Sequence, residues 1–216
     1  MKKYICFLFL AVCFLFAGCK ETVKIYDVMS EQTSLYFYGK ADAIECNISV
    51  GKREERYIVD GIHGKTVDFS LVTLKVDEVV DDRVEIVLEL NGKNSIIVLE
   101  LNPLNMTYMA DLGYGLKGND SIKIVYNECE VVLNNISNSF NVDYKKAIDI
   151  SMSELGSEIE DFYKNKVLSC EGYLRIVEGE RFGQQGYFWL FNIVGKEKSS
   201  SNILISVDDE KIILRG

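Results

Sequence analysis

The sequence is poor in proline, histidine and tryptophan. It holds one proline, one histidine and one tryptophan in 216 residues. A single proline, with no Ser/Gly-rich linker, argues against a long disordered region. The single histidine, His63, and the absence of a CxxC pair argue against a Cys/His zinc site. The composition therefore indicates a folded chain and argues against a Cys/His metal site.

The cysteines do not form a disulfide framework. Three of the six lie within the first 19 residues, and the others are Cys46, Cys129 and Cys170, scattered singly along the chain. Cys46 and Cys129 both lie on the apolar side of an alternating strand pattern. They could pair across a core, but two buried free thiols are the favoured interpretation.

No recognised catalytic fingerprint occurs. The sequence contains no GxSxG, HExxH, P-loop or dinucleotide-binding motif. The acidic runs at residues 81–82 and 208–210 lack the alternate spacing and central glycine of a calcium loop, and turn chemistry explains them better. His63 would need a nucleophile and an orienting group to act as a general base, so a surface loop histidine is favoured. We expect no cofactor and no metal.

The charge balance is acidic. Lys and Arg number 24 against 33 Asp and Glu, which gives a formal net charge of -9. No basic patch stands out along the chain. An acidic body repels nucleic acid and anionic lipid surfaces, so we expect no nucleic-acid partner.

The N-terminus has the organisation of a secretory signal. Lys2 and Lys3 precede an apolar run from Tyr4 to Ala17, about 14 residues long. A membrane-spanning helix needs roughly 20 apolar residues, so this run is too short for a permanent span. The pattern therefore predicts a signal peptide.

Residues 15–19, LFAGC, resemble the bacterial lipobox. The resemblance implies a diacylglyceryl group on the sulfur of Cys19 and cleavage between Gly18 and Cys19, with residues 1–18 as the lipoprotein signal peptide. Two acyl chains, at about 0.8 kcal/mol per buried methylene, hold a protein durably on a membrane. We therefore expect a lipoprotein anchored on the extracytoplasmic side of the cell membrane, with residues 19–33 as the lipidated cysteine and a tether. The alternative is a plain signal peptide with an incidental cysteine.

Residues 34–138 show the period of strands. Apolar residues alternate with polar ones over residues 44–50, and the clearest hairpin joins residues 84–90 to 96–98 through Asn91-Gly92, which supplies the positive φ of a tight turn. Six or seven short strands with no helix-period segment favour an antiparallel β-sandwich of the Ig-like type.

At Asn138 the period changes. Apolar residues recur at three- and four-residue steps over residues 143–165, which predicts one amphipathic helix capped by Asn141 or Asp143. Gly156 weakens its middle by about 1 kcal/mol relative to alanine and can split it in two. Strand patterns return from residue 167 onward. The expected fold is thus mainly β with one long helix: a sandwich over 34–138, then a small α+β domain over 139–216.

The second region is loosely similar to the PepSY type of extracytoplasmic domain, in which a helix packs on a short antiparallel sheet. The matching stretches are AIDISMSELG at residues 147–156 and VDDEKII at residues 207–213. Glu210 stands where such domains have a turn glycine. The resemblance covers about 70 residues.

Two groups of side chains are candidates for recognition. Arg53 and Arg56 belong to the densest charge cluster, which either docks an acidic partner or is a solvated hairpin loop, the favoured reading. Tyr187 and Trp189 lie in YFWLF, a strand with two apolar faces, which predicts cover on both sides. Core packing is favoured there, with Trp189 buried between helix and sheet; the rival is a surface for peptide or glycan.

The sequence supports three functional hypotheses. The first is a non-enzymatic binding or regulatory module, anchored through Cys19, that acts on another envelope protein or peptide. The second is an envelope hydrolase with a carboxylate pair acting on glycans, which needs no histidine. The third is a small solute-binding lipoprotein, weakened by the absence of alternating βαβ units. A cleft with two convergent carboxylates of raised pKa would favour the second hypothesis.

Overall fold

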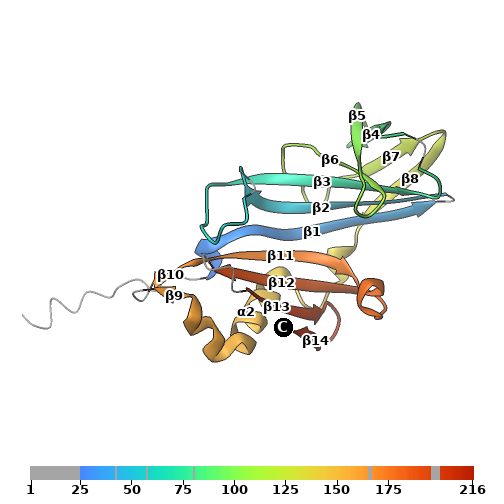
Figure 1. Cartoon of the computed structure of the whole chain (residues 1–216). Helices are drawn as coiled ribbons and strands as arrows, with labels where there is room; N and C mark the ends of the chain where they lie inside the picture. Colours follow the sequence, from blue (N-terminus) through green and yellow to red (C-terminus); the bar gives the residue numbers. More distant parts are fainter. Residues whose placement is uncertain (1–24, 42, 57, 80, 165–166, 196–199) are drawn as a thin grey trace, which may run out of the picture.

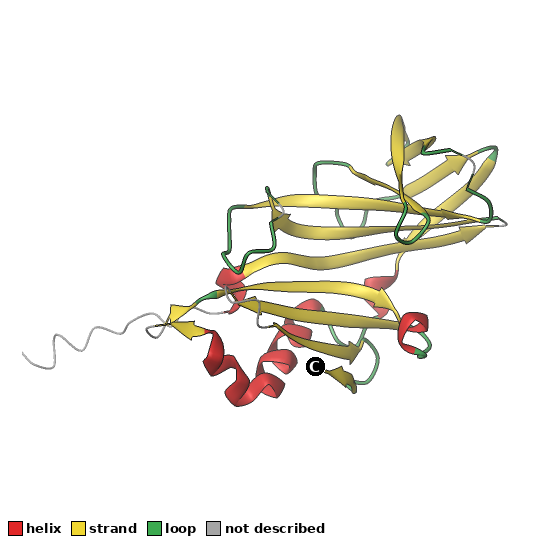
Figure 2. Ribbon diagram, in the orientation of Figure 1, coloured by secondary structure: helices red, strands yellow, loops and turns green. Residues whose placement is uncertain are grey.

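The computed structural model describes residues 25–41, 43–56, 58–79, 81–164, 167–195 and 200–216. The strands are β1 (Met29–Ala41), β2 (Ile44–Glu54), β3 (Thr66–Val76), β4 (Arg83–Leu90), β5 (Lys93–Asn102), β6 (Thr107–Asp111), β7 (Ile122–Tyr126), β8 (Cys129–Asn135), β9 (Tyr163–Lys164), β10 (Val167–Leu168), β11 (Cys170–Glu178), β12 (Tyr187–Gly195), β13 (Ser200–Ser206) and β14 (Ile212–Arg215). The helical elements are α2 (Tyr144–Leu155) and the 3-10 turns η1 (Ile25–Val28), η2 (Ile136–Ser139), η3 (Gly156–Phe162) and η4 (Gly179–Phe182). Figures 1 and 2 show their arrangement.

The predicted hairpin is confirmed. β4 and β5 pair antiparallel from Arg83↔Glu100 to Leu90↔Lys93. The two turn residues, Asn91 and Gly92, have φ of 51° and 77°. This left-handed conformation suits asparagine and glycine, which explains why the turn forms at this dipeptide.

The predicted sandwich is wrong, because the first eight strands close on themselves. Their order is β1-β2-β3-β6-β5-β4-β7-β8, and β8 pairs back with β1 at Phe37↔Asn135 and Tyr38↔Asn134. The result is a closed eight-stranded barrel. Strand alternation gives the same pattern for a sandwich and for a barrel, since both bury one face of each strand. The period therefore identified the strands and not their closure.

Gly39 lies at the seam where β1 meets β8. A Cβ at Gly39 would collide with the carbonyl oxygen of Val132 and lie 2.8 Å from side-chain atoms of Val131 and Leu133. A side chain at this position would push the two strands apart. Glycine here permits the close backbone approach that closes the barrel.

Apolar side chains fill the barrel interior. Fully buried residues from its strands include Phe37, Cys46, Ile48, Val72, Leu74, Ile86, Leu88, Leu99, Tyr108, Ile122 and Ile124. The one phenol among them, Tyr108, donates its hydroxyl to the carbonyl of Asp81 at 2.7 Å. This interior is a packed core, so a ligand site must lie on the outside.

The strands β11, β12, β13 and β14, here called the second sheet, continue from β1. β1 pairs parallel with β11, from Met29↔Gly172 to Gln32↔Leu174, and all these strands belong to one 12-stranded sheet. The first half of β1 therefore joins the second sheet, while its second half closes the barrel. This parallel, shared strand contradicts the prediction of a sandwich followed by an α+β domain.

A helix covers one face of the second sheet, as predicted, although it is shorter. α2 begins after Asp143, whose side chain accepts a hydrogen bond from the Lys146 N–H at 2.8 Å, and it ends at Gly156, with φ of 48°. The turn η3 then continues to Phe162. Gly156 thus splits the predicted segment, because its positive φ, which glycine adopts readily, cannot continue a right-handed helix.

Residues 25–33, which the sequence assigns to a tether, belong to packed structure. The described chain starts at Ile25, and η1 and the first residues of β1 are packed: Ile25, Val28 and Met29 are at most 8% exposed. The signal peptide, Gly18 and Cys19 lie outside the described residues. Within the part that the structure describes, no helix is long and apolar enough to cross a membrane.

Candidate functional site

A groove of about 810 Å³ runs along the outside of the barrel. Its floor is the outer face of β1, β2, β3 and β6, and β11 and η4 form one wall. Floor residues alternate with the residues of the barrel core: Thr33, Asn47, Ser49, Leu71 and Thr73. The floor therefore mixes polar side chains with apolar ones, such as Leu71, Phe69 and Met109, and is built on strands.

Fixed ion pairs line one end of the groove. Arg175 on β11 makes two hydrogen bonds to Glu31 on β1, at 2.7 and 2.8 Å, in the bidentate geometry that holds a guanidinium firmly. Arg53 on β2 pairs with Asp111 and stacks 5.3 Å from the ring centre of Phe69. The structure thus places Arg53 in the groove wall with its charge already matched.

Arg56 is not part of this wall. It lies beyond the end of β2 and its side chain is exposed, and it does not line the groove. The two arginines singled out from the sequence therefore do not act together. The dense charge cluster marks the end of a strand, and only Arg53 turns toward the groove.

Two carboxyl groups from different strands lie within electrostatic reach of each other at the other end of the groove. Glu178, at the end of β11, and Glu45, near the start of β2, both line it. Burial, and then the nearby charge of Glu45, raise the pKa of the Glu178 carboxyl, while Lys75 on β3 opposes the shift. A half-buried acid that resists ionisation is a common feature of functional clefts.

Three tyrosines pack beside these carboxyls. The ring centre of Tyr187 lies 5.5 Å from that of Tyr36 and 6.1 Å from that of Tyr38, both edge-on. Burial, followed by the charges of Tyr38, Glu178 and Glu45, raises the pKa of Tyr187. Tyr187 therefore supports this end of the groove from behind, and of the three only Tyr36 lines the groove.

Trp189 is a core residue, as favoured from the sequence. Its side chain is 1% exposed, and its indole Nε1 donates to the Val142 carbonyl at 2.7 Å. The ring of Phe140 packs against it edge-on at 6.2 Å. On the opposite face of β12, Phe188 lies against Gly179 of η4. Both faces of the aromatic strand are thus covered by this chain itself, and Trp189 is not a recognition residue.

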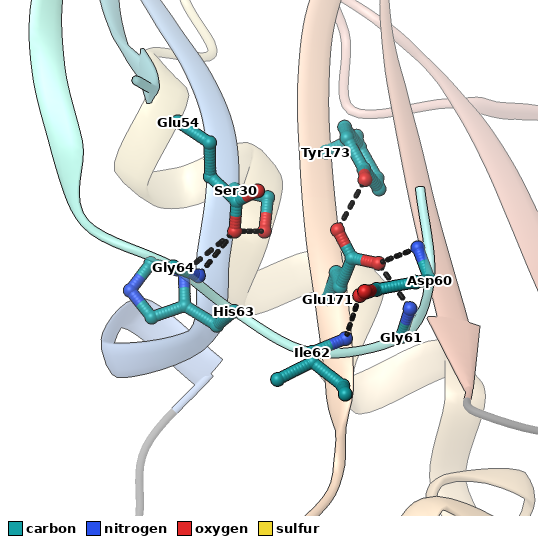
Figure 3. Close-up of polar contacts among 9 residues, drawn as sticks. All are labelled: Ser30, Glu54, Asp60, Gly61, Ile62, His63, Gly64, Glu171 and Tyr173. Atoms are coloured by element: carbon teal, nitrogen blue, oxygen red, sulfur yellow. Dashed lines mark hydrogen bonds and ion pairs between the residues drawn. The ribbon is translucent and has the colours of Figure 1, made fainter. Parts of the chain in front are cut away.

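Two buried carboxylates anchor the loop between β2 and β3, as Figure 3 shows. Glu171 on β11 is fully buried, and its Oε1 accepts the N–H groups of Asp60, at 2.7 Å, and of Gly61. Its Oε2 accepts the hydroxyl of Tyr173. Buried charges need such donors, because an unpaired carboxylate in a low dielectric is costly. Glu171 is therefore fully used in holding the loop.

Glu54 at the end of β2 serves the other side of the same loop. It is 5% exposed, and its Oε1 accepts the Ser30 hydroxyl at 2.7 Å and the Gly64 N–H. His63 Nδ1 lies 3.7 Å from the same oxygen. In a hydrolytic serine triad the imidazole lies between hydroxyl and carboxylate. Here the carboxylate lies between them, so this cluster is a loop anchor rather than a nucleophilic site.

Neither a metal site nor a reactive thiol is present among the described residues. Among them, no group of three or more His, Cys, Asp or Glu side chains could hold a metal ion. The thiols of Cys46, Cys129 and Cys170 are free, and burial raises the pKa of Cys170 to about 12, which leaves it unreactive near neutral pH. The groove is the candidate site.

No protein family model, no curated protein and no solved structure matches this chain. The groove is therefore interpreted from its own residues.

Sequence reasoning found only part of this site. It singled out Arg53 and Tyr187, but not Glu45, Glu178 or the Glu31–Arg175 pair. Each of these side chains occupies an ordinary polar position of an alternating strand. Glu171 gave no separate signal either, because its strand also carries Arg175 and Glu178 among apolar residues.

Proposed function

We propose that this chain is a lipid-anchored extracytoplasmic lipoprotein that acts, without catalysis, as a binding module for an extended peptide segment of another envelope protein. The anchor is the diacylglyceryl group on Cys19 implied by the lipobox-like residues 15–19. The open groove on the outside of a filled barrel is the observation that carries the binding role.

The lining of the groove supports a peptide over an apolar small molecule. Small-molecule pockets are mostly apolar with a few polar groups. This groove instead has a mixed lining: Thr, Asn and Ser side chains lie beside apolar ones on its floor, and charges of both signs line it as well. An extended peptide offers amides to the floor and side chains to the walls. The bidentate Glu31–Arg175 pair keeps one wall in place before binding, which lowers the ordering cost of association.

Site-specific photo-crosslinking on intact cells tests the binding role. A photoreactive amino acid at Thr73, on the groove floor, should give a discrete protein adduct. The same group at Val132, which is 61% exposed on the barrel, is the matched control and should give none. Equal adducts from both positions, or none from Thr73 at native expression, would contradict a peptide-binding groove.

The anchor has its own test. Cys19→Ser removes the only thiol at the predicted cleavage site, so it should abolish both processing at that bond and membrane retention. Fractionation with detergent extraction measures both. A Cys19→Ser protein that is still processed and still requires detergent would disprove the lipobox interpretation.

One observation favours a second function, a carboxylate-based glycan hydrolase. Glu178 has a raised pKa and shares the groove with Glu45, as a general acid and its partner carboxylate would. The discriminating experiment is release of reducing ends from cell-wall glycans by native protein and by Glu178→Gln. Turnover that Glu178→Gln abolishes without lowering the melting temperature would establish the hydrolase. The binding module predicts no turnover by either protein.

A further inference from the structure

Aliphatic side chains project into solvent from residues 58–64, here called the apolar loop. Ile58 is 56% exposed, Val59 56% and Ile62 54%. Three large aliphatic residues so exposed within five positions form a concentrated apolar surface on an otherwise acidic protein. Such surfaces on loops commonly mark contact with a partner or a membrane.

The apolar loop is held rigidly in this exposed position. Asp60 and Gly61 donate their N–H groups to Glu171, and Gly64 donates to Glu54. Asp60 Oδ1 accepts the Ile62 N–H at 2.9 Å, which tightens the turn (Figure 3). Because the backbone is bound to two buried carboxylates, the aliphatic side chains cannot fold back to cover themselves.

The apolar loop lies at the same end of the molecule as η1. A Cβ at Gly172 would meet the sulfur of Met29 and lie 3.6 Å from Ile25 Cδ1, so η1 packs on the start of β11. The neighbouring residue, Glu171, carries the apolar loop. Figure 1 shows both segments at the left end of the sheet, away from the β4–β5 hairpin.

The short segment between Cys19 and Ile25 limits how far this end of the molecule can lie from the proposed anchor. Only residues 20–24 separate Cys19 from Ile25. Six Cα–Cα steps span at most about 20 Å when fully extended. A diacylglyceryl group on Cys19 would therefore keep η1 within about 20 Å of the lipid surface, and the apolar loop beside η1 would be held there as well.

We infer that the apolar loop inserts Ile58, Val59 and Ile62 into the interfacial region of the lipid bilayer, as a second contact beside the anchor. This inference rests on the lipid anchor proposed at Cys19. A single flexible anchor leaves a protein free to rotate above the membrane. A second, rigid contact fixes which way the groove faces, because both the apolar loop and the groove are built on β2 and β11.

The charges flanking the apolar loop are consistent with an apolar contact rather than an electrostatic one. Lys65 pairs with Glu55 at 3.2 Å, and the loop itself carries one acidic residue, Asp60. With the exposed Arg56, residues 55–65 carry two acidic and two basic residues, so this stretch has no excess of positive charge to attract anionic lipid. Insertion should therefore occur in zwitterionic vesicles and should not require anionic lipid.

Depth-dependent fluorescence quenching tests the inference on the full, lipid-modified protein. Val59→Trp and Ile62→Trp each add an indole at the loop, and Ile96→Trp adds one on β5, where the side chain is 70% exposed. The native Trp189 is buried and gives a constant background. The vesicles are phosphatidylcholine, and phosphatidylcholine with phosphatidylglycerol, each with and without bromine on the acyl chains.

Insertion predicts that brominated lipid removes most of the added emission at position 59 or 62, with a blue shift, and leaves the added emission at position 96 unchanged. Both loop indoles unquenched on protein that floats with the vesicles would overturn the loop contact and leave the anchor intact. Native protein that does not float with vesicles would overturn the anchor and this inference together. Quenching confined to the vesicles with phosphatidylglycerol would overturn the apolar basis of the contact.

Discussion

The barrel and the second sheet build their cores in different ways from one shared strand. The barrel closes a sheet on itself and fills the inside with its own side chains, whereas the second sheet needs α2 to cover it. β1 serves both. Its consecutive residues Tyr36 and Phe37 point to opposite faces of the sheet. Tyr36 joins the core under α2, and Phe37 joins the barrel core.

This difference explains where a site can form. A strand that is buried on both faces offers no surface to a ligand. The barrel and the second sheet, however, separate from each other along β1. There β11 leaves β1 after Leu174, and β8 takes its place as the neighbour of β1 at Phe37. The groove opens along this divergence, between the outer face of the barrel and the end of β11. The candidate site is thus a consequence of one strand serving two sheets.

The largest expected effect comes from Trp189→Ala, in the core between the second sheet and α2. The change removes a fully buried indole and its bond to the Val142 carbonyl, and it should lower the free energy of unfolding by about 3–5 kcal/mol. Since β1 is shared, the barrel should melt in the same transition. Circular dichroism during urea unfolding measures the first effect, and hydrogen exchange of barrel peptides measures the second.

Val132→Ala, on an exposed barrel position, is the control for this change and should alter stability by less than about 0.5 kcal/mol. Barrel peptides that stay protected after the second sheet has melted would show two independent units. That outcome would restore the domain boundary that the sequence suggests near residue 138.

The second-largest effect is expected at the barrel seam, where β1 meets β8. Gly39→Ala places a methyl group against the Val132 carbonyl, where backbone must move to make room. Overpacking of this kind costs about 1–3 kcal/mol, so the melting temperature should fall. Gly216→Ala, where a Cβ meets nothing within 4 Å, is the matched control. An unchanged melting temperature for Gly39→Ala would mean that β1 and β8 do not close tightly.

The seam also shows what the sequence could not predict. The β4–β5 hairpin and the start of α2 follow from local residues, Asn91-Gly92 and Asp143, whose chemistry acts within a few positions. Barrel closure depends on Phe37 meeting Asn135, nearly a hundred residues away, and no local pattern encodes that partner. The burial of Trp189 was predictable because both of its strand neighbours are apolar.

The site was less predictable than the fold for the same reason. Glu45 and Glu171 sit at polar positions of alternating strands, which predict solvent exposure. Glu171 can be buried because the apolar loop, distant in the sequence, donates two backbone N–H groups to its carboxylate. The charge of Glu45 acts on Glu178 only because β2 and β11 are both neighbours of β1 in the sheet. These roles come from pairs of residues distant in sequence.

A third, smaller effect tests the link between the two regions. The apolar loop joins the barrel through Glu54 to the second sheet through Glu171. Glu171→Gln keeps the size of the side chain but removes the charge that strengthens its hydrogen bonds, and it should cost about 1–2 kcal/mol. Hydrogen exchange at residues 58–64 should accelerate. Glu85→Gln, exposed on β4, is the matched control and should leave the loop unchanged.

The smallest effect tests the groove by pH. The folded-state pKa of Glu178 is raised by burial and then by Glu45. The folded state therefore holds this proton more tightly than the unfolded state. Stability contributed by protonated Glu178 is present below the ordinary glutamate pKa, about 4.3, and is lost as pH rises through the raised value. Native protein should lose stability relative to Glu178→Gln across that window.

The comparison between native protein and Glu178→Gln cancels the other acids, because they titrate in both. Urea midpoints at a series of pH values from about 4 to 7 give the difference curve. Glu45→Gln in both backgrounds should flatten the curve, since it removes the neighbouring negative charge and leaves only the burial of Glu178. A difference independent of pH would mean that Glu178 faces solvent rather than Glu45.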